Sequence, residues 1–482
     1  MTSVIAIDVG TSAVRAAIVN VDGMLKRLVR VERKSGHSGL VFDAGQLWAD
    51  VCSALASLEA KREDDLRSLG VACHIGTVFT DETLAPLGVA GSWADTRGVD
   101  ILREEYLHGL GDLRLITGRP AITGGPLPAL LHLRMRHPDL YERTRWVLSP
   151  KDFLLARLTG EVVTDYTSAA YTMLSSVLDR EWNAGIMRDL DLPPSIFPAQ
   201  TLATEIIGHV TDVAAAYTGL PAGLCVVSGG PDGTLAATAV LGRLNTAIAD
   251  IAGTTDVLVQ LTKDMSSIPA AAVINPFTTS NMWSMGGATG MTGGALSRWS
   301  EILGFSSASQ ALEKYSSELA SMPPGAAGLF MQPMLSGSRF PTWDPDERAE
   351  LWGMSDHHSS EHLIRAAQEG AAYVVREGVE LLSPQVGPEP VLLAGGVAKS
   401  PSAAQLRADV LGRPILVCDS ENASLLGAAL TALVGCGLHS SVLEPLAETS
   451  NIVRHHEPDQ ARASRYEVLF SEWKSMRGSP SV

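Results

Sequence analysis

Cysteine is scarce in this chain, and the few cysteines present are not arranged for cross-linking. Five cysteines occur in 482 residues, an odd number scattered along the chain without any Cys-x-x-Cys spacing. The sequence therefore indicates neither a disulfide framework nor a zinc site. We expect a reducing compartment, and hence a cytoplasmic protein.

Basic residues are also in short supply. The chain has 37 Lys and Arg against 53 Asp and Glu, which gives a formal net charge of −16. Nucleic acids and anionic membranes are bound through a surplus of positive charge, so neither is expected as a partner. A polyanionic ligand would have to be met locally, by backbone amides and a cation. A homodimer remains open.

Membrane-length apolar runs are missing as well, and the first expected strand begins within four residues of Met1, without a preceding apolar signal core. The chain is too long for one typical core, and 45% of its residues are apolar. We therefore expect two large domains, over residues 1–243 and 244–440, followed by a helical extension over residues 441–482.

The strongest pattern lies at the start of the chain. Val4–Val9 and Val14–Val19 are apolar runs typical of two paired strands, and a short polar turn joins them. Gly10 allows a phosphate oxygen to approach backbone N–H groups, and the Thr11 and Ser12 hydroxyls can donate to it. Asp8, at the strand end, can hold a hydrated Mg²⁺. The alternative is an ordinary Asp-x-Gly hairpin without a ligand.

This pattern recurs in the second half of the chain. Residues 247–259 again read as strand, Gly-Thr turn and strand, with the turn formed by Gly253, Thr254 and Thr255. The repeat indicates an internal duplication in which Asp8 corresponds to Ile251. Both turns could grip phosphate, but only the first could also serve a metal ion. Such asymmetry suits one nucleotide clamped between two related halves.

Two polar groups suggest a polyhydroxylated ligand. Trp93, Asp95 and Arg97 alternate, so an extended segment would project all three side chains to the same side. An indole covers a C–H face, a carboxylate accepts hydroxyl protons, and a guanidinium donates to oxygens. The alternative is a half-buried Trp beside a surface ion pair. His74, at an expected strand end, is taken on its own merits as a satisfied histidine.

Two further turns follow expected strands. Residues 224–228 lead through glycines to Asp232 and a helix from Leu235, which places a carboxylate near the positive end of a helix. Such a carboxylate could accept a hydroxyl proton during in-line phosphoryl transfer, or could simply be a helix N-cap. Residues 391–394 lead to Gly395 and Gly396, whose backbone could lie flat against an adenine or ribose. The alternative there is a plain strand-to-helix turn.

Other stretches are expected to be structural. Glycines at 286, 287 and 290 suggest a flexible loop before a helix, and residues 362–382 show the apolar spacing of a long helix. Residues after Gly437 read as charged and helical.

Taken together, these pieces resemble an FGGY carbohydrate kinase of the actin/Hsp70/hexokinase-like superfamily, over about Ser3 to Gly437. Seven segments match in order: Asp8-Val9-Gly10-Thr11, Trp93-Ala94-Asp95-Thr96-Arg97, Pro150-Lys151-Asp152-Phe153-Leu154 with Leu158-Thr159-Gly160, Gly229-Gly230-Pro231-Asp232, Gly253-Thr254-Thr255, Leu335-Ser336-Gly337-Ser338-Arg339 with Trp343-Asp344-Pro345, and Gly395-Gly396-Val397-Ala398-Lys399-Ser400-Pro401. The resemblance implies an α/β fold of two actin-like (ribonuclease H-like) domains, each a mixed sheet flanked by helices, with a cleft between them.

The resemblance also implies ATP and Mg²⁺ as cofactors and a role for each matching residue. Asp8 would hold the metal shell, and Asp232 would be the catalytic base. The sugar would be bound by His74, Trp93, Asp95, Arg97 and Asp232. The nucleotide would be met by Gly10, Thr11, Ser12, Gly253, Thr254, Thr255, Gly395, Gly396 and Lys399.

One segment departs from the family pattern and limits the substrate prediction. Xylulose kinases usually show Gln-Met-His-Gly and glycerol kinases an Arg-Glu pair where this chain has Cys73-His74-Ile75-Gly76. Counting back from Asp81, Ile75 takes the place of the xylulose-kinase histidine. Glycerol is thus disfavoured, and a ketose such as a pentulose, or another polyol, is expected. The alternatives are a superfamily ATPase and a catalytically silent sugar sensor.

Overall fold

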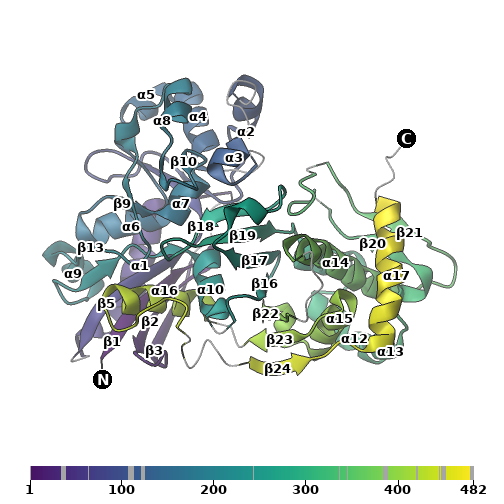
Figure 1. The fold of residues 1–482 in the computed structure, drawn as a ribbon. Helices are drawn as coiled ribbons and strands as arrows, with labels where there is room; N and C mark the ends of the chain where they lie inside the picture. The colour runs from purple at the N-terminus through teal and green to yellow at the C-terminus, as the bar shows by residue number, and fades with distance from the viewer. Residues whose placement is uncertain are drawn as a thin grey trace. The chain divides into compact units, whose positions relative to one another are not determined.

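The structure is a computed structural model, and it describes residues 2–33, 40–62, 65–106, 113–120, 125–242, 244–335, 337–344, 346–383, 389–418, 422–444, 446 and 452–477 (Figure 1). Ser336 and Pro345, from the motifs above, and residue 243, at the expected domain boundary, lie outside these residues. Helices and strands alternate along the described chain, which confirms the α/β class. No helix in the described parts is long and apolar enough to cross a membrane.

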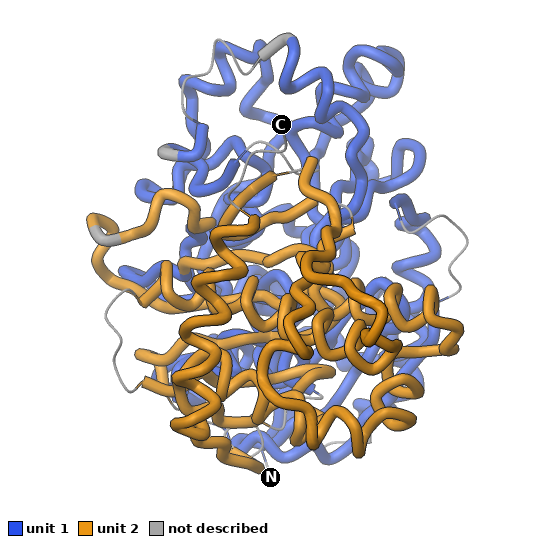
Figure 2. The backbone as a smooth tube through the Cα atoms, turned by 90° about the vertical axis from the view of Figure 1, so that its right-hand side faces the viewer, with its two compact units in different colours: residues 1–243, 274–284, 422–450 blue, residues 244–273, 285–421, 451–482 orange. Residues whose placement is uncertain are grey.

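By its internal contacts the chain divides into two compact units (Figure 2). Unit 1 comprises residues 1–243, 274–284 and 422–450, and unit 2 comprises residues 244–273, 285–421 and 451–482. Two segments from the second half of the sequence thus pack within unit 1. The sequential domain boundaries at 243 and 440 stay a prediction.

The main sheet of unit 1 has the strand order β13 (Ile206–His209), β14 (Cys225–Val227), β5 (Leu66–Cys73), β1 (Ser3–Val9), β2 (Ala13–Asn20) and β3 (Leu25–Glu32), and β15 (Gly230–Pro231) also pairs with β5. Strand β1 is antiparallel to β2 and parallel to β5, and β5 is parallel to β14. The expected first hairpin is therefore confirmed.

Helices cover both faces of this sheet, which explains why β1 reads as one continuous apolar run. Ile5 and Ile7 point to a core that contains α1 (Ala44–Ser57) and α6 (Pro150–Thr159). Val4 and Ala6 point to the opposite core, with α10 (Asp232–Leu241) and α16 (Ala423–Gly435). Helix α16 approaches so closely that a Cβ on Gly70 would lie 2.2 Å from the Ala428 carbonyl oxygen, so this position of β5 has no room for a side chain.

Smaller elements complete unit 1. A four-stranded sheet has the order β4 (Val41–Phe42), β7 (Ala90–Ser92), β6 (Gly76–Thr80) and β8 (Trp146–Leu148), and two strand pairs are β10 (Ser175–Ser176) with β11 (Glu181–Trp182) and β12 (Ala199–Thr201) with β9 (Val163–Asp165). The other described helices are α2 (Val99–Ile101), α3 (Leu113–Thr117), α4 (Pro126–Arg136), α5 (Pro138–Glu142), α7 (Tyr166–Tyr171), α8 (Ala184–Asp189) and α9 (Asp212–Thr218).

The sheet of unit 2 has the order β19 (Trp283–Ala288, of which residues 285–288 belong to this unit), β17 (Asp256–Thr262), β16 (Ile248–Ala252), β22 (Val391–Gly395), β23 (Ile415–Cys418) and β24 (Ile452–His456). Strand β18 (Val273–Pro276) falls mostly within the unit 1 segment 274–284. The helices of unit 2 are α11 (Thr292–Ile302), α12 (Ala308–Lys314), α13 (Ser316–Ser321), α14 (Ser360–Leu382), α15 (Pro401–Leu411) and α17 (Gln460–Arg477), and β20 (Phe330–Gln332) pairs with β21 (Glu350–Trp352). Helices α14, α15 and α17 contribute to one core with strands β16, β22 and β23.

The two sheets share a topology, which confirms the internal duplication. Strand β16 is antiparallel to β17 and parallel to β22, β22 is parallel to β23, and β23 is antiparallel to β24. These are the relations of β1 to β2 and β5, of β5 to β14, and of β14 to β13. The match extends to single hydrogen bonds, because His74 N–H donates to Val9 O at 2.9 Å and Gly396 N–H to Ala252 O at 2.6 Å.

Two local expectations fail. Gly286 and Gly287 lie within strand β19 and not in a loop. A Cβ at Gly286 would come 1.9 Å from the Leu258 carbonyl oxygen of β17, so this glycine serves a close backbone approach. Strand β24 was not expected in the C-terminal stretch.

Candidate active site

Three strands of unit 1 end side by side and carry two carboxylates. In the register of the sheet, Ala72 of β5 pairs with Asp8 of β1 on one side and with Gly230 of β15 on the other. Asp232 follows β15 directly and is the first residue of α10. Gly229, just before β15, has φ +63°, and a Cβ there would lie 2.1 Å from Val71 O. Glycine is therefore required for the chain to turn into this position.

The Asp232 carboxyl group has the electrostatics of a base. Burial, followed by the Asp8 charge, raises its pKa to about 6, against the Gly233 N–H and Arg15, which act to lower it. Gly233 N–H donates to Asp232 Oδ1 at 2.7 Å. The N-cap of α10 is Pro231, so the alternative in which Asp232 is merely the N-cap does not hold.

Asp8 is held by Arg15 from the facing strand. Arg15 Nε donates to Asp8 Oδ2 at 2.9 Å, and Arg15 Nη2 contacts the same oxygen. Arg15 Nη1 also reaches Asn422 Oδ1 at 3.2 Å. Both Nε and Nη2 contact Oδ2, so Arg15 orients the Asp8 carboxylate through that oxygen.

The first turn, Gly10 to Ser12, projects beyond the strand ends. Gly10 N–H donates to Ala13 O at 2.9 Å and closes the turn, while Thr11 and Ser12 are exposed. The structure thus brings Asp8, this turn and Asp232 to one edge of the unit 1 sheet. Their roles toward a metal ion and phosphates stay predictions.

The second turn, Gly253 to Thr255, is built differently. Gly253 N–H donates to Thr255 O at 3.1 Å, and Gly294 N–H, in the first turn of α11, donates to Thr254 O at 2.9 Å. Behind the turn, the buried Asp256 is held by Thr292 and by Arg407, whose Nη1 lies 3.0 Å from Asp256 Oδ1. Gly253 and Thr254 themselves are exposed.

Gly395 and Gly396 end strand β22 beside this second turn, since Gly395 pairs with Ala252. Gly395 has φ +92°, and a Cβ there would lie 2.4 Å from Ala252 O, so only glycine fits. Gly396 and Lys399 are exposed. Gly253 to Thr255, Gly395 and Gly396, the unit 2 glycines and threonines expected to meet the nucleotide, therefore lie together at one edge of the unit 2 sheet.

The segment from Trp93 to Arg97 is a turn and not the extended segment that was expected. It follows β7, and Asp95 N–H donates to Ser92 O at 3.1 Å. Arg97 nevertheless meets Asp95, with Nη2 to Oδ2 at 2.7 Å and Nε to Oδ1 at 2.9 Å. Asp95 is buried, Arg97 is partly exposed, and Trp93 is 47% exposed. The indole is therefore partly accessible to solvent.

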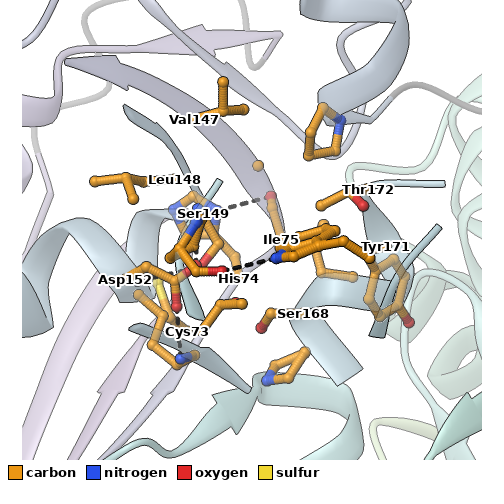
Figure 3. A pocket seen from close by; sticks show the side chains of 17 residues that line it. Cys73, His74, Ile75, Val147, Leu148, Ser149, Asp152, Ser168, Tyr171 and Thr172 are labelled. Carbon is orange, nitrogen blue, oxygen red and sulfur yellow. Dashed lines mark hydrogen bonds and ion pairs between the residues drawn. The ribbon is translucent and has the colours of Figure 1, made fainter. Parts of the chain in front are cut away.

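Unit 1 contains a pocket at the end of β5, lined by Cys73, His74 and Ile75 (Figure 3). Its wall includes Pro231, which precedes Asp232, and Gly76, whose strand β6 pairs with β7 just before Trp93. Its other lining residues come from several strands, helices and connections of unit 1: Pro126, Val147, Leu148, Ser149, Lys151, Asp152, Thr164, Ser168, Tyr171, Thr172, Trp182 and Pro198. The pocket thus extends from the end of β5 to Pro231, the residue that precedes Asp232.

His74 lines this pocket with both ring nitrogens engaged. Nε2 lies 3.3 Å from Arg33 Nη1, and Nδ1 lies 3.1 Å from Ile75 O. Arginine can only donate, so Nε2 accepts and Nδ1 carries the proton. Burial, together with the charge of Arg33, lowers the pKa of His74 to about 4, against the hydrogen bond to Ile75 O, which acts to raise it. The imidazole is a satisfied strand-end histidine, and its expected contact with a substrate stays a prediction.

Sequence reasoning missed two buried groups at this site. Lys151 Nζ lies 2.7 Å from Asp152 Oδ1 and 3.2 Å from Asp165 Oδ1, and all three side chains are 2% exposed. Asp152 also forms a capping box with Ser149. The sequence shows the motif that contains Lys151, but nothing in that motif indicates a pocket. No pattern in the sequence around Arg33 indicates a functional role for it.

Comparison with known proteins agrees with this arrangement. The model of the FGGY family of carbohydrate kinases, N-terminal domain, matches residues 3–239, and the C-terminal domain model matches residues 249–436. A xylulose kinase of Bacillus subtilis is 27% identical over 99% of this chain and 97% of its own, and a gluconokinase of Bacillus licheniformis is 25% identical over 98% and 94%. The crystal structure of a ligand-bound xylulose kinase from Lactobacillus acidophilus superimposes with a TM-score of 0.90 at 20% identity, over 99% of this chain and 98% of that one. This chain belongs to the FGGY family of carbohydrate kinases.

Proposed function

We propose that this carbohydrate kinase transfers the γ-phosphoryl group of ATP to a hydroxyl of a ketose, most simply a pentulose, with Asp232 as the general base. The observation that carries the proposal is the position of Asp232, beside both the pocket and the Gly10 to Ser12 turn, with a pKa raised to about 6. A base poised near neutral pH can accept a proton and still be deprotonated at the start of the reaction.

The transfer exchanges one bond for another. The substrate oxygen forms a bond to the γ-phosphorus, the bond from that phosphorus to the β–γ bridging oxygen breaks, and the hydroxyl proton passes to Asp232. Gly233 N–H engages Oδ1, so we assign proton acceptance to Oδ2. The products are a sugar phosphate and ADP.

Backbone amides and hydroxyls would position the phosphates. Thr11 and Ser12 are exposed in the first turn, as are Gly253 and Thr254 in the second. Exposed amides in turns of this kind suit phosphate oxygens. Gly396 and Lys399, at the end of β22, are assigned to the nucleoside side of ATP.

The donor set at Asp8 fits magnesium. Mg²⁺ prefers oxygen ligands and is commonly held by one or two carboxylates together with water and substrate phosphates. No group of three or more His, Cys, Asp or Glu side chains converges on a metal site among the described residues, and such a shared site needs none. Asp8 would hold the ion, which when bound neutralises charge on the phosphates.

The ketose assignment rests on relatives and on the acceptor side of the site. Several relatives that align over nearly the whole chain are xylulose kinases, and others are gluconokinases. Trp93 offers a partly exposed aromatic face that could cover the C–H face of a polyhydroxylated chain, and the buried Asp95 offers a carboxylate oriented by Arg97. Cys73 to Gly76 keeps the place but not the residues of the xylulose-kinase motif, so a pentulose other than xylulose belongs in any test.

The test is ADP release measured against a panel of pentuloses, hexuloses, aldonates and polyols, each with a sugar-free control. We expect turnover that depends on a ketose. ADP release without any sugar would indicate an ATPase, and sugar binding without turnover would indicate a sensor; either result would overturn the proposal. If the enzyme prefers an aldonate, the proposed substrate class changes from a ketose to an aldonate and the proposed mechanism stays the same.

A further inference from the structure

Arg33 connects the first turn to the wall of the pocket. Its backbone N–H donates to Ser12 O at 2.8 Å, and its guanidinium Nη1 donates to Gly10 O at 2.8 Å. The same Nη1 lies 3.3 Å from His74 Nε2, and His74 in turn reaches Ile75 O. One buried side chain therefore contacts both parts of the site.

Its surroundings fix the Arg33 guanidinium in place. The side chain is 9% exposed, Nε lies 3.8 Å from Asp50 Oδ2, and the group lies 5.6 Å from the centre of the Phe42 ring. Phe42 also packs edge-on against the His74 ring, at 5.2 Å. A guanidinium with this many fixed contacts is a rigid element and not a mobile surface charge.

The contact with Gly10 bears directly on the amide that follows it. A peptide unit is planar and trans, so Thr11 N–H points away from the Gly10 carbonyl in the same unit. By holding that carbonyl, Arg33 directs Thr11 N–H toward the opposite side. A charged donor on the carbonyl also polarises the unit and makes the N–H a stronger donor.

We propose that Arg33 is a positioning residue that couples the two substrates, by joining the Gly10 to Ser12 turn to the acceptor pocket through His74. When a sugar fills the pocket it fixes His74 at the end of β5, and the rigid Arg33 passes that constraint to the Gly10 carbonyl, which holds the turn ready for phosphate. The inference rests on the proposed function of that turn. It predicts that sugar tightens nucleotide binding, and that nucleotide tightens sugar binding by the same factor.

The experiment measures the dissociation constant of a non-hydrolysable ATP analogue with Mg²⁺, with and without the ketose that gives the highest turnover in the panel above. Their ratio is the coupling factor. We expect a factor of about five or more in the wild type, which is the lower range of allosteric coupling, and about one in Arg33→Met. Arg33→Lys keeps the positive charge but lacks the planar guanidinium with its several N–H donors, so we expect an intermediate coupling factor.

Arg67→Met is the matched control. Arg67 lies near the start of β5, at the opposite end of the strand from His74, and it is exposed beside Asp65. This variant removes the same charge away from the turn, and its coupling factor should equal that of the wild type.

A second variant keeps the test decisive if Arg33→Met is unstable. His74→Phe retains a ring against Phe42 and removes the Nε2 acceptor. If Arg33 acts through His74, this variant also loses coupling, and the double variant loses no more than either single one. Additive losses would contradict the connection through His74.

The outcomes separate the inference from the proposed function. A wild type that binds no nucleotide analogue would overturn both. A wild type that binds the analogue with a coupling factor near one, or an Arg33→Met variant that keeps the wild-type factor, would overturn the inference alone.

Discussion

Asp8 and Asp232 flank the end of a single strand, and the negative charge of Asp8 raises the pKa of Asp232. Asp8 pairs with Ala72 across β1 and β5, and Asp232 follows Pro231, which pairs with Cys73 of the same strand. The negative charge of Asp8 contributes to the raised pKa of Asp232, after burial. The residue proposed for the metal ion therefore also helps to set the strength of the proposed base.

Replacing Asp232 by Asn removes the proton acceptor and keeps the shape of the side chain. We expect phosphorylation to fall by about a hundredfold or more, because general base catalysis contributes on the order of a hundredfold to ten-thousandfold. Nucleotide binding should be unchanged. Turnover and nucleotide affinity, measured on the same preparation, check this, and near-full activity would exclude Asp232 as the base.

The pH dependence of kcat/KM should show the pKa of Asp232. A base works when deprotonated, so kcat/KM is expected to fall as pH drops through about 6. In Asp8→Asn the repelling charge is gone, and the inflection should move to lower pH even if overall activity is reduced. Asp22→Asn, at the opposite end of β2, should leave the inflection where it is. An inflection that does not move in Asp8→Asn would contradict the electrostatic link.

Trp93 is expected to matter for the sugar and little for the fold. Its side chain is 47% exposed, so Trp93→Ala should change the melting temperature only slightly. We expect KM for the sugar to rise by about tenfold, equivalent to roughly 1.4 kcal/mol of lost contact, with KM for ATP unchanged. Tyr217→Ala, at a residue 63% exposed, is the control. Equal effects of the two variants would argue against a sugar contact.

Substitutions at two neighbouring glycines should distinguish an effect on folding from an effect on nucleotide binding. A Cβ on Gly396 would meet Ala252 O at 3.6 Å, an ordinary contact, and its φ of −64° suits alanine. Gly396→Ala should therefore keep the melting temperature and weaken nucleotide binding by about tenfold, if the nucleoside lies there. Gly395→Ala, with φ +92° and a clash at 2.4 Å, should lower stability by on the order of 1–3 kcal/mol. Unchanged nucleotide affinity in a well-folded Gly396→Ala variant would show that the nucleoside does not bind against Gly396.

Glu369 should make unit 2 sensitive to pH. It is buried in α14, and Tyr466 Oη and Gly325 N–H donate to its Oε1 at 2.8 and 3.1 Å. Burial raises its pKa to about 7 from 4.5, so the folded state favours the protonated form. Its contribution to stability is full below about pH 4.5 and is lost as pH rises through 7, roughly 3 kcal/mol in all.

Urea unfolding of the wild type and of Glu369→Gln at pH 5 and pH 8 tests this. Glutamine stays neutral, so the variant should gain stability relative to the wild type between the two pH values. A difference between the two proteins that is the same at both pH values would show that Glu369 does not titrate in this range.

Local patterns in the sequence predicted the strands and turns that carry the two carboxylates. The first hairpin followed from uninterrupted apolar runs on either side of a polar turn, and the Asp232 turn from paired glycines, one of which the backbone requires. Trp93 to Arg97 was misread as extended, because alternation in sequence does not show that Asp95 closes a turn on Ser92. Strand β24 was missed because its Arg and His residues suit an edge strand as well as a helix.

The remaining parts of the site depend on residues far apart in the chain. Arg33 and His74 are 41 positions apart, and Lys151 meets Asp165 only when α6 packs beside β9. No periodicity or spacing encodes such contacts. Gly286 reads as a loop residue until the approach of β17 shows why no side chain is tolerated there.

The matching hydrogen bonds at the ends of β5 and β22 mean that one main-chain arrangement occurs twice in the chain with different side chains. The same main-chain frame presents Asp8 and His74 in one copy and Ile251 and Gly396 in the other. What separates an acid-bearing edge from a glycine-lined one is thus a handful of side-chain replacements. After an internal duplication, side-chain replacement on an unchanged main-chain frame is therefore enough to make two edges with different chemical groups.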